Sequence, residues 1–361
     1  MRSVAEIKAA LAQAATDAGF ELFGIAPVND FPELEYFPRW IAAGHAGEMK
    51  YMAARDDQGR WKRSSLAHAA PWARSVVVCA INYNTAQPYS TQTGNPSQGW
   101  ISRYAWGGDY HDSVMQRLRR VDVALQNVTA ADDLVTRCYV DTGPIVERVV
   151  AKYAGIGWLG KNTCLINQKL GSWLFLGVIL TSLDLTSPEE TLPAPDRCGS
   201  CTRCIDACPT DAFIAPYQLD SNKCISYLTI EKRGSIPEAV RAGVGRHVFG
   251  CDICQDVCPW NRKAPATIAD DFQPRPELLN PDLEWLAQMG ADDFRRTFQN
   301  SPVLRAKPTG LRRNAILAMG NSGDRKFLPL LKQLLIDKDE VIRETAAWAS
   351  DKLTATLKLQ F

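Results

Sequence analysis

The sequence has no hydrophobic run long enough to cross a membrane. Its longest apolar stretch, residues 173–183, is about half the length of roughly 20 residues that a membrane-spanning helix needs. Residues 1–20 have apolar positions at helical spacing with charged residues between them, which predicts an amphipathic helix and not an export signal. We therefore expect a cytoplasmic protein without a membrane segment.

Two common cofactor signatures are also missing. No GxGxxG motif follows a predicted strand and opens a helix, so a dinucleotide-binding fold has no support. The four histidines do not have the spacing of a metal site, and a lone histidine is usually satisfied within the structure. They are His45, His68, His111 and His247. Any electrons that the protein uses are expected to come from an external carrier.

Eleven cysteines occur in a chain without a predicted export signal. Because the cytosol keeps thiols reduced, a disulfide scaffold is not expected. The cysteines at 198, 201, 204 and 208 have the spacing of bacterial ferredoxins, and Pro209 follows them. This spacing lets one loop bring three thiolates to a 4Fe-4S cluster and directs the fourth thiolate to a second cluster.

The second cluster needs a complementary set of cysteines. The run at 251, 254 and 258 before Pro259 lacks one member, and Cys224 supplies it. Crossed ligation, as in two-cluster ferredoxins, predicts one cluster on Cys198, Cys201, Cys204 and Cys258 and the other on Cys208, Cys224, Cys251 and Cys254. Zinc is the alternative for two CxxC pairs, but it leaves the CxxCxxCxxxCP run unexplained. The other three cysteines lie in apolar stretches and are expected to be structural. They are Cys79, Cys138 and Cys164.

The length of 361 residues predicts two or three domains. Before the cysteine segment, which runs from residue 197 to about residue 263, short apolar runs at 20–25, 75–81, 137–140 and 173–180 predict buried strands in an α/β region. The polar stretch 84–99 is expected to be an exposed loop. After a proline-rich connector at 264–281 the pattern is helical, and residues 313–320 are echoed at 343–350. This tail resembles a short HEAT-like pair of helices, and a plain helical cap is the alternative.

Basic charge gathers near the C-terminus although the formal net charge is only +1. Between residues 301 and 326, six lysines and arginines stand against one acidic residue, Asp324. Such a cluster attracts phosphates, but a charge run is more often a solvated helix face. From charge alone, nucleic-acid binding stays an open alternative.

Three further motifs are present, two before the cysteine segment and one that surrounds its second set of cysteines. They are DTGP at 141–144 with Glu147 and Arg148, GIGWLGKN at 155–162, and FGCDICQDVCPWN at 249–261. Together with the paired cluster motifs and the helical tail, these residues resemble the epoxyqueuosine reductase family of tRNA queuosine synthesis. The resemblance spans nearly the whole chain.

The resemblance implies a reaction and its cofactors. Members of this family remove the epoxide oxygen of epoxyqueuosine at the tRNA wobble position, with two electrons and release of water, using cobalamin fed by two 4Fe-4S clusters. The implied architecture is an α/β cobalamin-binding domain at 1–192, an α+β ferredoxin-like double-cluster domain with its connector at 193–280, and an all-α HEAT-like tRNA-binding region at 281–361. The implied partners are tRNA and an external electron donor such as ferredoxin or flavodoxin, and we expect a monomer.

A general acid must protonate the departing oxygen, and the resemblance places it at Asp141. This residue is predicted to lie at the end of a strand, where α/β proteins often place their sites. In the alternative reading, Asp141 or Thr142 only caps the following helix, with Pro144 in its first turn.

Further contacts are expected at residues that match family positions or flank the cluster ligands. The candidate cobalamin contacts are Arg60, Asp141, Lys161, Asn162, Ser226, Tyr227, Gln255 and Asp256. Arg312 and Arg313 are hypothesised phosphate contacts to tRNA. From spacing alone, the glycine-punctuated turn at 155–160 fits a tight helix-to-strand connection equally well. The aromatics Tyr104, Trp106 and Tyr110 could stack on a flipped base, but such residues are more often core.

Two other functions fit part of the sequence. A reductive dehalogenase would share paired clusters and a corrin-binding domain, but no twin-arginine segment is found and the basic tail suits a polyanionic substrate better. A non-catalytic electron carrier or nucleic-acid-binding scaffold would use the clusters only as structural parts. Cobalamin binding would separate these possibilities.

Overall fold

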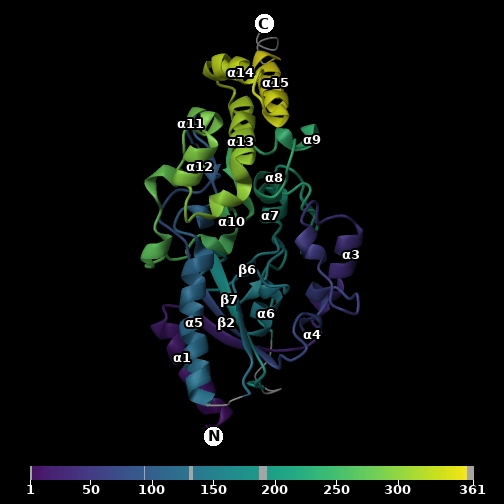
Figure 1. Cartoon of the computed structure of the whole chain (residues 1–361), viewed down its shortest axis with the longest axis vertical. Coiled ribbons are helices and arrows are strands. Elements are labelled where there is room, and N and C mark those ends of the chain that lie inside the picture. The colour runs from purple at the N-terminus through teal and green to yellow at the C-terminus, as the bar shows by residue number, and fades with distance from the viewer. Residues whose placement is uncertain (1, 93, 130–132, 187–192, 356–361) are drawn as a thin grey trace.

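The computed structural model describes residues 2–92, 94–129, 133–186 and 193–355. The α/β part lies at the N-terminal end of an elongated molecule, the cysteine segment lies near its middle, and the last helices lie at the opposite end (Figure 1). Within the described residues, no helix has both the length and the apolar character needed to span a membrane.

A four-stranded sheet organises the N-terminal half. Its order is β1 (Leu22–Pro27), β2 (Ser75–Asn82), β7 (Leu174–Thr181) and β4 (Thr136–Tyr139), and each neighbouring pair is antiparallel. All residues of β2 are buried, as expected for an apolar strand at the centre of a covered sheet. These strands confirm the four that the apolar runs predicted.

Helices cover both faces of this sheet. Residues 77, 79 and 81 of β2 pack with α1 (Val4–Asp17) and α5 (Tyr110–Thr129), whereas residues 76, 78 and 80 pack with α6 (Glu147–Tyr153). This alternation follows from the two-residue period of a strand. In Figure 1, α1 and α5 lie side by side on one side of the sheet and α6 lies on the other.

The cysteine segment contains short helices and strands. They are α7 (Arg203–Asp206), β8 (Phe213–Ala215), β9 (Gln218–Leu219), α8 (Ile225–Ile230), α9 (Glu238–Arg241), β10 (His247–Phe249) and α10 (Ile253–Asp256). Helix α7 contains Cys204 of the first motif, helix α10 contains Cys254 of the second, and the two helices contact one another. The two cysteine motifs therefore lie side by side.

The C-terminal region is helical, as the sequence predicted. It consists of α11 (Leu283–Gln288), α12 (Ala291–Thr297), α13 (Lys307–Ser322), α14 (Leu328–Leu334) and α15 (Glu340–Ala355). Helices α13 and α15, which carry the two similar segments, pack closely. A Cβ atom added at Gly320 would lie 2.8 Å from the Cα of Ala349, so the close approach depends on glycine.

Short elements complete the chain. They are α2 (Pro32–Glu35), α3 (Phe37–Ala42), α4 (Leu66–Ala69), β3 (Trp100–Ile101), β5 (Trp158–Leu159) and β6 (Leu165–Ile166), with 3-10 turns η1 (Lys50–Ala53), η2 (Lys62–Ser64), η3 (Arg103–Ala105), η4 (Pro259–Asn261), η5 (Asp270–Phe272), η6 (Pro276–Leu278), η7 (Pro302–Ala306) and η8 (Arg325–Phe327).

The N-terminal segment contributes to a core that it shares with the C-terminal helices. Strand β3 pairs in parallel with β10, and Trp100, Ile101 and Trp106 pack with buried residues of α11, α13 and α15. Of the three aromatics considered for base stacking, Trp106 is therefore a core residue. The predicted domain boundary at residue 192 falls within residues 187–192, which lie outside the described residues.

The prediction of an exposed loop at 84–99 is wrong in part. Four of its polar residues are buried, namely Asn84, Thr85, Ser90 and Ser97. The Ser90 hydroxyl donates to the Asp256 carboxylate, and the Arg103 guanidinium donates to the carbonyls of Gln87 and Pro88. Because these polar groups have partners inside the protein, the loop can pack against the cysteine segment.

Candidate cluster and active site

The thiols of the two cysteine motifs lie in two groups. In the first, burial and then the charges of Cys198 and Cys201 raise the pKa of the Cys204 thiol to about 11. Burial also raises the pKa of Cys258 to about 11, and the charges of Cys198 and Cys204 add to this effect. Cys258, from the second motif, therefore lies near Cys198 and Cys204 of the first and packs against Cys198.

The second group contains Cys208 of the first motif together with Cys224 and two cysteines of the second motif, Cys251 and Cys254. Burial raises the pKa of Cys251, and the charges of Cys224 and Cys208 contribute to the shift. The charges of Cys251 and Cys224 likewise act on Cys254. This is the grouping that crossed ligation predicts, although the assignment of each ligand stays a prediction. Crowded thiolates are favourable only when metal ions compensate their charge, so this donor set fits iron–sulfur clusters.

Cys164 lies beside the second group and not in an isolated apolar position. Each of the thiols of Cys164 and Cys254 shifts the pKa of the other, so the two side chains lie close together, and the Cys164 backbone N–H donates to Asn162 Oδ1 at 3.2 Å. The strands β5 and β6 hold the turn from which it projects. Nothing in the local sequence indicates this contact, because it joins residues 90 positions apart.

Lys161 and Asn162 connect this turn to both cysteine motifs. Lys161 Nζ donates to the carbonyls of Gly199 at 2.6 Å and Cys201 at 3.0 Å, and Asn162 Nδ2 donates to the carbonyl of Cys254 at 3.3 Å. Lys161 thus contacts the first cysteine motif, and Asn162 contacts the second. Their contact with cobalamin stays a prediction.

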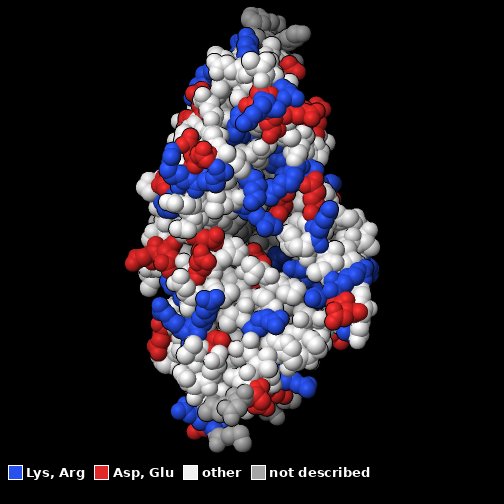
Figure 2. All heavy atoms as spheres, viewed as in Figure 1, with Lys and Arg blue, Asp and Glu red and all other residues white. Residues whose placement is uncertain are grey.

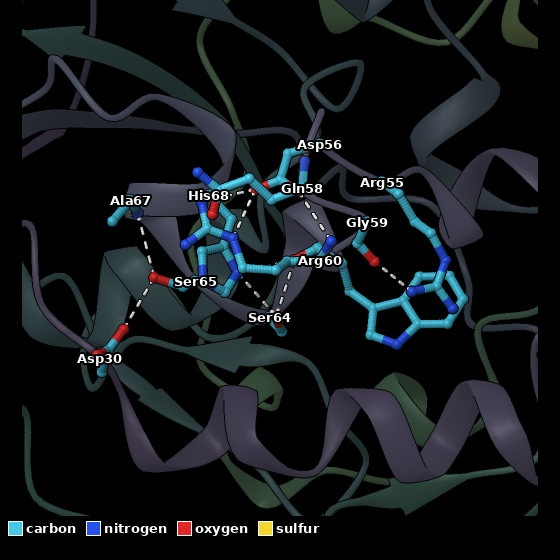
Figure 3. A network of polar contacts seen from close by, with 11 residues as sticks. Asp30, Arg55, Asp56, Gln58, Gly59, Arg60, Ser64, Ser65, Ala67 and His68 are labelled. Atoms are coloured by element: carbon cyan, nitrogen blue, oxygen red, sulfur yellow. Dashed lines mark hydrogen bonds and ion pairs between the residues drawn. The ribbon is translucent and has the colours of Figure 1, made fainter.

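Arg60 lies on the turn between η1 and η2, where its charge is paired locally. Its Nη2 lies 2.8 Å from Asp56 Oδ2, and its side chain is 47% exposed. Figure 3 shows this pair beside Arg55 and Gln58, and separately the Ser65 hydroxyl, which donates to Asp30 and accepts from the Ala67 N–H. Arg60 is thus accessible, and its predicted role as a cobalamin contact remains a prediction.

Four candidate residues lie on α8 and α10. The Tyr227 hydroxyl accepts from the backbone N–H of Glu48 at 2.7 Å, and Ser226 beside it is half-buried. Gln255 Nε2 donates to both the carbonyl and the hydroxyl of Ser172 at 3.0 Å. These contacts hold the cysteine segment against the N-terminal half.

Asp256 is a buried carboxylate with an unused acceptor. Ser90 and the Thr91 backbone donate to its Oδ2, whereas its Oδ1 is buried without a partner among the described residues. Burial, followed by the charge of Asp252, raises the pKa of Asp256 to about 7.

The prediction that Arg313 contacts tRNA phosphate is wrong. The residue is only 2% exposed, and its guanidinium donates to the backbone carbonyls of Leu228, Lys232 and Gly234. Burial lowers the pKa of Arg313 to about 10, so it stays charged at neutral pH. Arg313 therefore joins α13 to the cysteine segment.

Arg312 is also engaged within the protein. Its Nη2 lies 2.6 Å from Asp337 Oδ2, its Nε donates to the Ala287 carbonyl, and its side chain is only 16% exposed. A phosphate would have to compete with a neighbouring carboxylate for this guanidinium.

Arg313→Met should destabilise the protein by about 3 kcal/mol, because the buried carbonyls of the cysteine segment would lose their charged donor. We expect a lower midpoint of thermal unfolding and unchanged tRNA affinity per folded molecule. Arg325→Met, at an exposed position, is the matched control and should unfold like the wild type. Equal stability of the two variants would contradict the structural role.

Asp141 lies in the loop between β4 and α6. Its backbone has a φ of 56°, and its N–H donates to Glu147 Oε1 at 2.8 Å. The Tyr110 hydroxyl donates to Asp141 Oδ2 at 2.9 Å, and the carboxylate is 69% exposed. The helix-cap alternative is wrong, since α6 begins at Glu147 and Val146 occupies its N-cap position.

The surroundings of Asp141 are polar. Arg63 donates to the carbonyls of Gly143 at 2.9 Å and Tyr51 at 2.8 Å, which fixes the loop after Asp141. Burial, and then the charge of Asp141, raises the pKa of Glu147 to about 8. When it is protonated, an exposed carboxyl group held among such groups can deliver its proton to a bound molecule.

Two protein-family models match parts of this chain. A family model described as 4Fe-4S double cluster binding domain matches residues 197–261, and one described as Epoxyqueuosine reductase QueG, DUF1730, matches residues 63–142. The protein carries two 4Fe-4S clusters in this segment.

Relatives and solved structures agree with these matches. The chain is 45% identical to the epoxyqueuosine reductase of Synechocystis sp., over 81% of this chain and 98% of the relative, and 38% identical to that of Pseudomonas aeruginosa, over 92% and 91%. A crystal structure of epoxyqueuosine reductase with an epoxyqueuosine-modified tRNA-Tyr stem loop has a TM-score of 0.84 at 32% identity, covering 97% of this chain and 91% of that one. The chain therefore belongs to the epoxyqueuosine reductase family.

Proposed function

We propose that this protein reduces the epoxide of epoxyqueuosine in tRNA to the cyclopentene of queuosine. The observation that carries the proposal is the exposed carboxylate of Asp141, held by Tyr110 and Glu147 in a chain with two groups of cluster thiols. The family relationship supports the substrate, because one similar enzyme was crystallised with an epoxyqueuosine-modified stem loop.

Asp141 acts as the general acid in this proposal. The epoxide oxygen leaves as water, so it must receive protons as its carbon–oxygen bonds break. Proton delivery by a positioned group is commonly worth about a hundredfold or more. A similar enzyme from Bacillus subtilis, 31% identical, has been seen with its catalytic aspartate loop swung out of the active site, which is consistent with an acid carried on a loop.

Cobalamin is the proposed cofactor between the N-terminal half and the cysteine segment. When bound, it would supply a reduced cobalt centre for the strained epoxide. The buried, unpartnered Oδ1 of Asp256 and the polar turn of Lys161 and Asn162 fit the many amide groups that surround a corrin ring. The full set proposed to hold it is Arg60, Asp141, Lys161, Asn162, Ser226, Tyr227, Gln255 and Asp256.

The C-terminal helices are proposed to form a HEAT-like region that binds the tRNA. With Arg313 buried, the exposed cations Lys307 and Arg325 are the better phosphate contacts. Figure 2 shows a hollow near the middle of one face with lysine and arginine side chains beside it, an arrangement suited to a polyanion. We propose the domain limits 1–192, 193–280 and 281–361, a cytoplasmic monomer, and an external electron donor.

The test is anaerobic incubation of the cluster-loaded protein with cobalamin, a reductant and a stem loop bearing epoxyqueuosine, followed by nucleoside mass analysis. We expect queuosine to form only when cobalamin is present. No conversion by protein with verified iron and bound cobalamin would reject this substrate.

A further inference from the structure

A histidine–aspartate pair lies beside the acid of the active site. Asp109 and His111 frame the start of α5, and His111 Nδ1 lies 2.7 Å from Asp109 Oδ1. The opposite ring nitrogen, Nε2, lies 3.9 Å from Asp141 Oδ2. One imidazole therefore connects a half-buried carboxylate with the exposed carboxylate of Asp141.

The aromatic packing around this pair restricts its position. The Tyr110 ring stacks on Phe175, with centroids 4.3 Å apart and planes 2° apart, and His111 stacks on Tyr110 at 4.1 Å. Tyr110 and His111 both approach Oδ2 of Asp141, and no described residue bonds its Oδ1. One carboxylate oxygen thus faces the protein, while the other is available to a bound substrate.

The proposed reaction needs more protons than one carboxyl group holds. An epoxide, two electrons and two protons give an alkene and water, with both carbon–oxygen bonds broken and both protons on the departing oxygen. Asp141 carries a single proton, so it must be protonated again within each turnover. The electrons come through the clusters, and the second proton must reach Asp141 from the protein or the solvent.

We propose that His111, oriented by Asp109, returns the proton to Asp141. The inference rests on the proposed function, since it assigns the proton source for that reaction. A small side-chain shift brings His111 Nε2 from 3.9 Å to hydrogen-bond distance of Asp141 Oδ2, where the imidazolium transfers its proton. The imidazole is then protonated again from solvent, to which its side chain is 35% exposed. His111 acts through Asp141 and is thus a positioning residue.

The charges that face His111 favour its protonated form. Burial opposes the charge, but the hydrogen bond and charge of Asp109, with the charges of Asp141 and Asp112, raise the pKa of His111 above its ordinary value. Asp109 and Asp112 come from its own segment, and Asp141 comes from the loop between β4 and α6. The conversion rate should therefore fall as pH rises through a value above 6.5.

The experiment compares multiple-turnover conversion of an epoxyqueuosine stem loop by the cluster- and cobalamin-loaded wild type and His111→Gln between pH 6 and pH 9. We expect His111→Gln to lose about tenfold or more in rate, to lose the fall at high pH, and to regain rate when imidazole is added. Asp109→Asn should move the fall to lower pH, because it removes the charge that favours the imidazolium.

His45→Gln is the matched control, because His45 forms a similar pair with an aspartate of the cysteine segment, Asp220, at 3.4 Å. It should keep the wild-type rate and pH profile. A His111→Gln enzyme with the wild-type rate and pH profile would overturn the inference, as would a loss of rate that imidazole does not restore together with an unshifted Asp109→Asn profile. A wild type that forms no queuosine would instead reject the proposed function.

Discussion

Asp141→Asn should lower the rate of queuosine formation by about a hundredfold or more while leaving cluster content and stem-loop affinity at wild-type levels. The amide has no acidic proton to give to the departing oxygen. Its oxygen can still accept from Tyr110, whose hydroxyl lies 2.9 Å from Asp141 Oδ2. Asparagine also tolerates the φ of 56° at this position, so the loop should keep its shape.

The measurement is single-turnover conversion by enzyme that has been reduced beforehand, with nucleoside mass analysis. Asp211→Asn is the matched control, because Asp211 is a second exposed aspartate with a positive φ, of 49°. It should convert the substrate at the wild-type rate. A near-normal rate for Asp141→Asn would remove Asp141 as the acid and direct attention to Glu147.

The strands of the sheet were predictable because they consist mainly of apolar residues, which are usually buried. Apolar runs such as 75–81 are stable only when buried, and the four predicted runs correspond to the four strands of one sheet. The pairing of β3 with β10 could not be predicted, since each is only two or three residues long and they lie about 150 positions apart in the chain. For that reason the shared core of the N-terminal segment and the C-terminal helices was missed.

The predicted exposure was wrong for polar residues whose hydrogen-bond partners are backbone carbonyls inside the protein. Arg313 was placed on the surface because arginine usually lies there, yet its donors are used by three carbonyls of the cysteine segment. The loop 84–99 was predicted to be exposed for the same reason. Composition reports the polarity of a side chain but not whether the fold supplies its partner.

The site residues that could be predicted are those whose chemistry is carried by spacing or by a family motif. The grouping of the thiols follows from ferredoxin spacing, and Asp141 follows from the resemblance. The positions of Cys164 beside the second thiol group and of Asp109 and His111 beside Asp141 were not predicted. An aspartate two residues before a histidine at the start of a helix was a usable signal, but its meaning depends on the distant loop that carries Asp141.

The crossed ligation of the two clusters can be tested by pairing alanine substitutions that share Cys198. Cys198→Ala with Cys258→Ala should remove ligands from one cluster only, because these thiols lie in one group. Cys198→Ala with Cys208→Ala should remove a ligand from each cluster. The wild type should bind about eight iron atoms, the first double variant about four and the second close to none.

Local ligation, with each motif binding its own cluster, predicts the reverse order. Cys198 and Cys208 would then share a cluster, and Cys198 and Cys258 would not. Iron analysis with electron paramagnetic resonance of the reduced proteins distinguishes the two arrangements, because each makes one double variant retain a cluster. Cys138→Ala, which changes a thiol outside both groups, should keep the full iron content. Since cluster binding and folding of the cysteine segment are coupled, the variant that loses both clusters should also unfold at the lowest temperature.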